Sequence, residues 1–223
     1  MLFVLDTSTE MVGMCLYDGV QVVAEQLWKS KNFHTVELVP TINRMFKQAG
    51  FHTKELTALG VALGPGSFTS LRIGLSVIKG LALPLNLPIV GMPSLDILAA
   101  CQPAKNVPML AILHLGRGRL ASMRYQYQDG AWKSTTDLLV SDARELAKTI
   151  DSPIYICGEM DSHERQLLGR KWKTAEVAPA SMCVRRPLVF AEMVWERVQN
   201  NQVQPIAELS PIYVHTLSNV PDL

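Results

Sequence analysis

The chain has 223 residues and a mass of 24.7 kDa, which predicts one large or two small domains. Its hydrophobic content of 48% can fill the interior of such a protein, so intrinsic disorder is excluded as the main state. The 21 Lys and Arg residues nearly balance the 20 Asp and Glu residues, and the net charge of +1 excludes a general electrostatic attraction to nucleic acid or to an anionic membrane.

Signals for a membrane or for export are weak in this sequence. The longest uncharged stretches, 56–71 and 80–95, are shorter than the roughly 20 residues of a spanning helix, and prolines break the second one. Asp6 interrupts the apolar start and no positive segment precedes it, so we expect no signal peptide and a cytoplasmic protein. The cysteines have no C-x-x-C spacing and are expected to be small buried hydrophobes: Cys15, Cys101, Cys157 and Cys183.

The first half of the chain begins with a predicted three-stranded meander. Asp18-Gly19 is a strong hairpin signal, and an amphipathic helix follows, closed by Gly50, with Pro40 tolerated only in or near its first turn. The predicted elements are strands over 2–6, 11–17 and 20–28, a helix over 36–49, a strand over 59–63, a helix over 71–83, a strand over 88–91 and a helix over 94–101.

The second half repeats this order less regularly, after a linker over 102–107. Its predicted elements are strands over 109–113, 120–127 and 131–140, a helix over 141–150, a strand over 154–157, a helical face over 188–198 and a tail over 205–214. Such alternation predicts an α/β fold with a mixed sheet flanked by helices in each of two lobes. We assign 1–103 to an N-terminal lobe and 104–186 to a smaller C-terminal lobe, with 187–223 packing back on the first.

Two polar loops carry the candidate chemistry. The run Asp6-Thr7-Ser8-Thr9 could hold a hydrated metal and phosphate oxygens, or its side chains could simply bond the local backbone. In the run from Gly64 to Gly74, the glycines and a helix N-terminus suit an anion, although a capped strand-to-helix turn fits equally well. The tentative phosphate contacts are Asp6, Thr7, Ser8, Gly64, Gly66, Ser67 and Thr69.

Other kinds of site have little support in the sequence. The five histidines show no metal-binding spacing, so we expect no metal site, and no G-x-S-x-G elbow is present for serine catalysis. A basic and aromatic cluster is either an exposed strand face or an RNA contact; it comprises Arg117, Arg119, Arg124, Tyr125 and Tyr127.

Four motifs together resemble one family. They are L-x-x-D-T-S-T at the start, a helix beginning His34-Thr35 with Pro40, G-P-G-S-F-T-x-L-R-I-G from Gly64, and E-L-S-P-I-Y from Glu208. This combination resembles the bacterial tRNA threonylcarbamoyladenosine biosynthesis proteins of the TsaB (YeaZ) family, once described as glycoprotease-like. The resemblance implies a two-lobed, actin-like ATPase (ribonuclease H-like) fold.

The resemblance also implies a noncatalytic role. Members of this family activate a TsaD-type transferase that forms threonylcarbamoyladenosine at position 37 of tRNA, together with a TsaE-type ATPase. The metal-binding histidines of the transferase fall at Pro93 and Ile97 here, neither of which can bind a metal. We therefore expect no catalytic residues, no cofactor on the chain alone, ATP and magnesium only in the complex, and indirect contact with tRNA. Departures from the family pattern occur at Ser70, at 114–116 and at His215.

The family also implies that the first-lobe helices, 36–49 and 71–83, form a homodimer interface that serves for the heterodimer as well. Apolar residues spread over more than one stripe of each helix, so either a face is left for a partner after core packing or both faces are buried within the lobe. The tentative interface residues are Val39, Ile42, Met45, Phe46, Arg72, Leu75 and Ile78. The alternatives are an ATP-dependent phosphotransferase or ATPase acting through Asp6 and the loop 64–67, and a peptidase, which only the old family name suggests.

Overall fold

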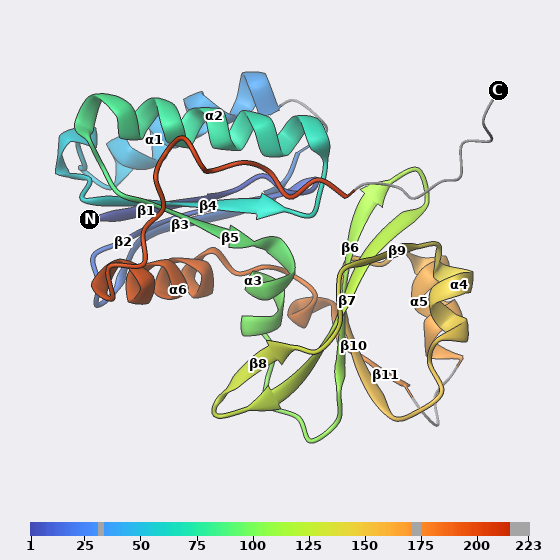
Figure 1. Ribbon diagram of the computed structural model, residues 1–223. Coiled ribbons are helices and arrows are strands. Elements are labelled where there is room, and N and C mark those ends of the chain that lie inside the picture. Colours follow the sequence, from blue (N-terminus) through green and yellow to red (C-terminus); the bar gives the residue numbers. More distant parts are fainter. Residues whose placement is uncertain (31–33, 171–174, 215–223) are drawn as a thin grey trace.

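A computed structural model describes residues 1–30, 34–170 and 175–214. It contains two sheets, each flanked by helices (Figure 1). The elements up to residue 100 are β1 (Leu2–Asp6), β2 (Met11–Tyr17), β3 (Val22–Lys29), α1 (His34–Gln48), η1 (Thr53–Glu55), β4 (Ala58–Gly64), α2 (Phe68–Leu85), β5 (Ile89–Pro93) and α3 (Ser94–Ala100). Those that follow are β6 (Met109–Gly116), β7 (Arg119–Gln128), β8 (Ala131–Ser134), β9 (Leu139–Ser141), α4 (Ala143–Lys148), β10 (Ile154–Gly158), α5 (Ser162–Gly169), β11 (Ala175–Val177), η2 (Ala180–Met182) and α6 (Pro187–Gln199).

The strand orders are β3-β2-β1-β4-β5 in the first sheet and β11-β10-β6-β7-β8 in the second, where β9 also pairs with β7. In the first sheet, β1 is antiparallel to β2 and parallel to β4. In the second, β6 is antiparallel to β7 and parallel to β10. The prediction of an α/β fold with two mixed sheets is therefore confirmed.

The first sheet buries both of its faces, because side chains alternate along each strand. On β1, Phe3 and Leu5 pack with α1 and α2, whereas Leu2 and Val4 pack with α6 on the opposite face. Figure 1 shows α1 and α2 on one side of this sheet and α6 on the other. The C-terminal helix thus completes the core of the N-terminal sheet. The helix α3 contributes to this second core and also to a core of the second sheet.

Both long helices differ from their predicted bounds, and each contains a proline. The helix α1 begins at His34, so Pro40 lies inside it rather than near its start. Pro40 and Val36 face solvent, where water can satisfy the Val36 carbonyl that loses its helical partner. The helix α2 continues through Pro84 and ends where Asn86 adopts a left-handed conformation with φ of 49°.

Several short elements also differ from the predictions. Strand β3 begins at Val22 instead of residue 20, because the Asp18 carboxylate accepts the amides of Val20 and Gln21 and widens the turn. The predicted strand over 131–140 is two strands, β8 and β9, separated where Thr135 and Thr136 bond the backbone of Arg124. Strand β11 and helix α5 were not predicted.

By length and composition alone, α2 could cross a membrane; it is the one such helix in the described part of the chain. The search for long uncharged stretches did not find this helix, because Arg72 and Lys79 lie within it. Its inner face, with Leu75, Ile78 and Ala82, belongs to the first core, and core helices pass the same test.

Two of the four cysteines behave as expected: Cys15 and Cys157 are buried. The other two, Cys101 and Cys183, are only partly buried. All four are free thiols.

Candidate functional site

A cleft of about 670 Å³ lies between the two sheets, where the loops that follow β1, β4 and β10 meet the end of β6. Residues from both lobes line it: Thr9, Glu10, Met11, Lys29, Ser67, His114, Leu115, Gly116, Gly158, Glu159, Met160, Asp161 and Cys183. Polar residues of the Asp6 loop and the Gly64 loop therefore meet the second lobe here.

The two loops of the first lobe are packed directly against each other. A side chain at Gly66 would collide with the backbone of Ser8, and one at Gly74 would collide with Thr7. The amide of Ser67 donates to the carbonyl of Ser8 over 2.7 Å. The glycines of the G-P-G-S-F-T-x-L-R-I-G run thus allow the Asp-Thr-Ser turn to rest on the start of α2.

The hydroxyl groups of the Asp6 loop are used inside the protein. Thr7 Oγ1 donates to the carbonyl of Ser70 over 2.7 Å, and the Ser8 hydroxyl is hydrogen-bonded to that of Ser94 at the start of α3. The Ser94 hydroxyl in turn accepts the amide of Gly64 over 3.2 Å. All of these hydroxyl groups are buried.

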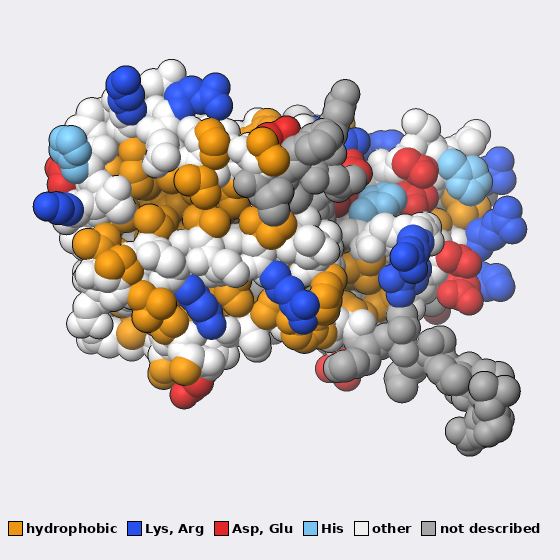
Figure 2. All heavy atoms as spheres, turned by 90° about the horizontal axis from the view of Figure 1, so that it is seen from above, with side chains coloured by type: hydrophobic (Ala, Val, Ile, Leu, Met, Phe, Trp, Pro, Cys, Tyr) orange, Lys and Arg blue, Asp and Glu red, His pale blue; other side chains and the backbone are white. Residues whose placement is uncertain are grey.

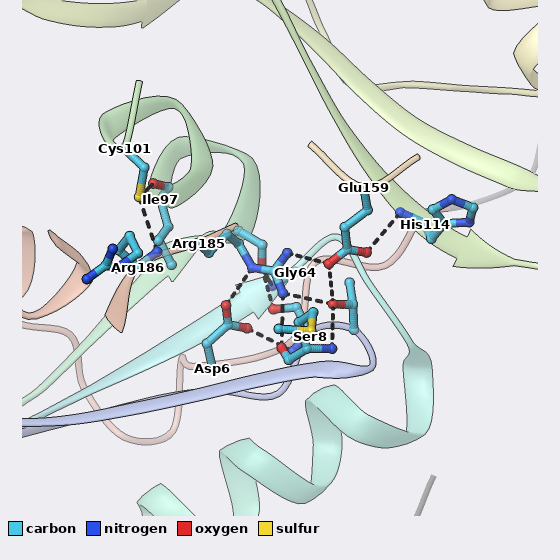
Figure 3. Close-up of polar contacts among 12 residues, drawn as sticks. Asp6, Ser8, Gly64, Ile97, Cys101, His114, Glu159, Arg185 and Arg186 are labelled. Atoms are coloured by element: carbon cyan, nitrogen blue, oxygen red, sulfur yellow. Dashed lines mark hydrogen bonds and ion pairs between the residues drawn. The ribbon is translucent and has the colours of Figure 1, made fainter. Parts of the chain in front are cut away.

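Arg185 lies at the centre of the site (Figure 3), and sequence reasoning missed it. It follows η2, where the chain returns from the second lobe to α6, and its side chain is 2% exposed. Its Nε donates to Asp6 Oδ2 over 2.6 Å and its Nη1 to Glu159 Oε1 over 2.8 Å. Its Nη2 donates to Thr9 Oγ1 over 2.8 Å and, more weakly, to the carbonyl of Met11 over 3.3 Å.

The positive charge of Arg185 and the negative charges of Asp6 and Glu159 stabilise one another. Burial lowers the pKa of the Arg185 guanidinium, but the carboxylates of Asp6 and Glu159 outweigh burial and hold that pKa above its ordinary value. Asp6 Oδ1 also accepts the amide of Ser8 over 2.8 Å. Both oxygens of Asp6 are therefore engaged, one with the local backbone and one with Arg185.

On the second lobe, His114 and Glu164 form a further pair beside the cleft. His114 Nε2 lies 2.8 Å from Glu164 Oε2, and the His114 amide donates to Glu159 Oε2 over 3.4 Å. Glu164 belongs to a capping box with Asp161 at the start of α5. That Asp-x-x-Glu spacing was the signal that could have revealed α5.

The predicted basic and aromatic cluster is not one surface. Tyr125 is buried and donates to Asp96 over 2.8 Å, Arg124 donates to the carbonyl of Thr149, and Tyr127 packs on Trp132. Alternation along β7 sends neighbouring side chains to opposite faces. Among the described residues, no group of His, Cys, Asp or Glu side chains is arranged to hold a metal ion.

Comparison with known proteins gives the family. The sequence model described as "TsaD: tRNA N6-adenosine threonylcarbamoyltransferase" matches residues 22–168. The tRNA threonylcarbamoyladenosine biosynthesis protein TsaB of Bacillus subtilis is 29% identical over 167 residues, 74% of this chain and 73% of that protein. The chain belongs to the family that this sequence model describes, in its TsaB (YeaZ) branch. TsaB of Escherichia coli is 31% identical over 132 residues, 57% of this chain and 56% of that protein.

Two solved structures agree with the fold, one of them from the TsaB branch. YeaZ from Pseudomonas aeruginosa superposes with a TM-score of 0.74 at 21% identity, covering 96% of this chain and 99% of that one. Component A of (R)-2-hydroxyglutaryl-CoA dehydratase from Acidaminococcus fermentans superposes more loosely, with a TM-score of 0.51 at 11% identity, covering 89% and 100% of the two chains.

The two positions at which the resemblance places metal-binding histidines of the transferase carry other residues in this member of the TsaB branch. Pro93 is the last residue of β5, and Ile97 is fully buried in α3. Of the other departures from the family pattern, Ser70 is buried, and its carbonyl and hydroxyl bond Thr7 and Ser67. The departure over 114–116 places His114 at the cleft, and His215 lies outside the described residues.

The predicted interface residues need correction. Ile42, Met45, Phe46, Leu75 and Ile78 belong to the core beneath α1 and α2, so a partner cannot reach them. Val39 and Arg72 are exposed. Both helices pack on the sheet and on each other, and this packing buries the stripe of regularly spaced apolar residues from which the interface was predicted.

The accessible face of these helices keeps Val39 and Arg72 and adds residues that were not predicted. A groove of about 420 Å³ runs between α1 and α2 and is lined by Leu38, Val39, Phe68, Thr69, Arg72, Ile73, Ser76 and Val77. Phe68 is 53% exposed and Val39 is 48% exposed. Figure 2, which looks down on this face, shows hydrophobic side chains gathered over the first lobe.

Proposed function

We propose that this chain is a noncatalytic subunit that pairs with a TsaD-type transferase and activates it for the formation of threonylcarbamoyladenosine at position 37 of tRNA. The names of its curated relatives support the pathway. The apolar groove between α1 and α2 supports the pairing, because Phe68 and Val39 expose apolar area that a partner would remove from water.

A role without chemistry of its own has separate support. Pro93 and Ile97 carry no metal-binding atoms at the positions that match the transferase histidines. Four carboxylates in or near the cleft are paired with basic side chains: Asp6 and Glu159 with Arg185, Glu164 with His114, and Glu10 with Lys29. In this proposal, a TsaE-type ATPase joins the complex, tRNA is held by the transferase, and the same groove forms a homodimer when the chain is alone.

Light scattering after size-exclusion chromatography tests the pairing, with the chain alone and mixed with the TsaD-type protein of the same organism. We expect a heterodimer or a larger complex at micromolar concentration. The variants Val39→Glu and Val77→Glu should weaken pairing at least tenfold, because each puts a charge into the groove. The matched control is Val20→Glu, at a position 89% exposed in the β2–β3 turn, which should pair normally.

An absence of any complex, or equal pairing by all three variants, would remove the support for this function. Binding of ATP and magnesium to the chain alone at sub-millimolar concentration would instead favour the phosphotransferase or ATPase reading.

A further inference from the structure

We propose that Arg185 is a built-in cation that locks the two lobes across the cleft and holds the carboxylate that a magnesium-bound nucleotide would need. This role does not depend on the identity of the partner. It concerns the isolated chain and gives a physical reason why the chain would need no nucleotide to fix its shape.

The actin-like fold implies ATP and magnesium, and the residues present do not fit that pair. Asp6 is the candidate carboxylate for a hydrated metal at the end of β1, and Arg185 Nε contacts its Oδ2 at 2.6 Å. The Ser67 amide and the hydroxyls of Thr7 and Ser8, all of which could have faced phosphate oxygens, are bonded within the protein. The Ser67 amide and the Thr7 hydroxyl would each have to break an internal hydrogen bond to receive a ligand.

The charge of the cleft also disfavours a nucleotide. Five carboxylates lie in or beside it, those of Asp6, Glu10, Glu159, Asp161 and Glu164, against the cations Lys29 and Arg185 and one histidine, His114. A triphosphate entering the cleft would meet this excess of negative charge, and like charges at close range in a partly buried site repel.

Arg185 forms hydrogen bonds to residues of both lobes and so connects them. Asp6 and Thr9 belong to the end of β1 and the loop after it in the first sheet, whereas Glu159 follows β10 in the second. A single guanidinium bonds all three, and Thr9 Oγ1 also donates to Glu159 Oε1 over 2.5 Å. Without the guanidinium, two carboxylates from opposite lobes would face each other in a buried site with no counter-ion. Such a site would either open or take up a divalent cation, since oxygen atoms from both lobes would then be free to bind one.

Arg185→Met tests this, because Met keeps much of the volume and removes the charge. We expect its melting temperature to fall by roughly 6–20 °C. The matched control is Arg186→Met, which removes an exposed arginine paired with Glu25 at 3.7 Å and should shift the melting temperature by no more than about 2 °C.

The second measurement is the melting temperature in about 10 mM Mn²⁺. We expect no shift for the wild-type chain and a rise of roughly 3–5 °C for Arg185→Met, because the freed oxygens bind Mn²⁺ at millimolar concentration. Adding Asp6→Asn to Arg185→Met should abolish that rise. Equal stability of Arg185→Met and Arg186→Met, or an equal Mn²⁺ response in the wild type, would overturn the proposal.

If Arg185→Met does not fold, the triple variant with Asp6→Asn, Glu159→Gln and Arg185→Met decides between charge and packing. This variant removes all three charges while largely keeping the side-chain shapes. If Arg185 acts by neutralising the two carboxylates, the triple variant should fold and its melting temperature should not respond to Mn²⁺. A triple variant that also fails to fold would show that Arg185 acts by packing alone, and the proposal would be wrong.

Discussion

Cys15 lies on β2 in the core that α6 completes, and its side chain has no exposed surface. Burial, followed by the charges of Glu25 and Glu192, raises the pKa of its thiol from 9.0 to about 12. The neutral thiol is therefore favoured in the folded protein over a range in which the unfolded chain gives up its proton. The resulting stability is complete below pH 9 and is lost as the pH rises toward 12.

This predicts that removing the thiol flattens the pH dependence of folding. The Cys15 thiol contributes a slope of about −1.4 kcal/mol per pH unit to the free energy of unfolding between those two pKa values. Cys15→Ala should lose that slope, even though it lowers stability at every pH by leaving a small cavity. Urea unfolding between about pH 8 and pH 10 measures it, with Cys183→Ala, at a partly exposed position, as the control. A slope that Cys15→Ala leaves unchanged would contradict the assignment.

At the scale of elements, α2 shows how far periodicity reaches. The spacing of Leu71, Leu75 and Ile78 predicted a helix correctly, and these three side chains are buried against the sheet. The same spacing does not mark the accessible face of the helix, because the most regular stripe packs inside the lobe. Ile73 and Val77, which lie on the side facing α1, line the groove instead.

Neighbouring residues of α2 should therefore respond differently to truncation. Ile78→Ala should lower the free energy of unfolding by about 2–5 kcal/mol, since Ile78 has no exposed surface and its loss leaves a cavity. Val77→Ala should lower it by less than about 1 kcal/mol and weaken pairing instead. Urea unfolding together with light scattering of the partner mixture separates the two. The reverse ranking would return Ile78 to the interface.

At the scale of the whole molecule, the chain beyond α6 ties distant parts together. Gln204 Oε1 accepts the amide of Gly91 over 2.7 Å, Lys79 Nζ donates to the carbonyl of Leu209 over 2.8 Å, and the Ile212 amide donates to the carbonyl of Leu63 over 2.7 Å. Figure 1 shows this segment crossing from α6 to the side of α2. The segment over 204–212 is thus tied to the first lobe and contributes to its core.

Shortening a single tail side chain should consequently destabilise the first lobe. Leu209 is 3% exposed and belongs to the core under α1 and α2, so Leu209→Ala should cost about 2–5 kcal/mol. Val203, at 42% exposed, is the matched control, and Val203→Ala should cost less than about 1 kcal/mol. Thermal unfolding compares the two variants. Equal melting temperatures would mean that the tail does not support the core.

The sequence by itself determined the fold class and the two polar loops. Alternating apolar residues, the Asp18-Gly19 turn and helical spacing are local signals, and each acts within a few residues of the chain. The run from Gly64 to Gly74 was recognisable for the same reason. Short elements such as α5 were missed, because a helix of this length carries little periodicity apart from its capping box.

Only the tertiary structure decided which groups meet at the site. Arg185 lies 179 positions from Asp6 in sequence, and no local pattern marks it as the partner of Asp6 and Glu159. Which stripe of α1 and α2 stays accessible was likewise decided by packing against the sheet, because burial depends on what lies opposite a side chain. Contacts of this kind join residues far apart along the chain, so their physical cause lies in the folded arrangement.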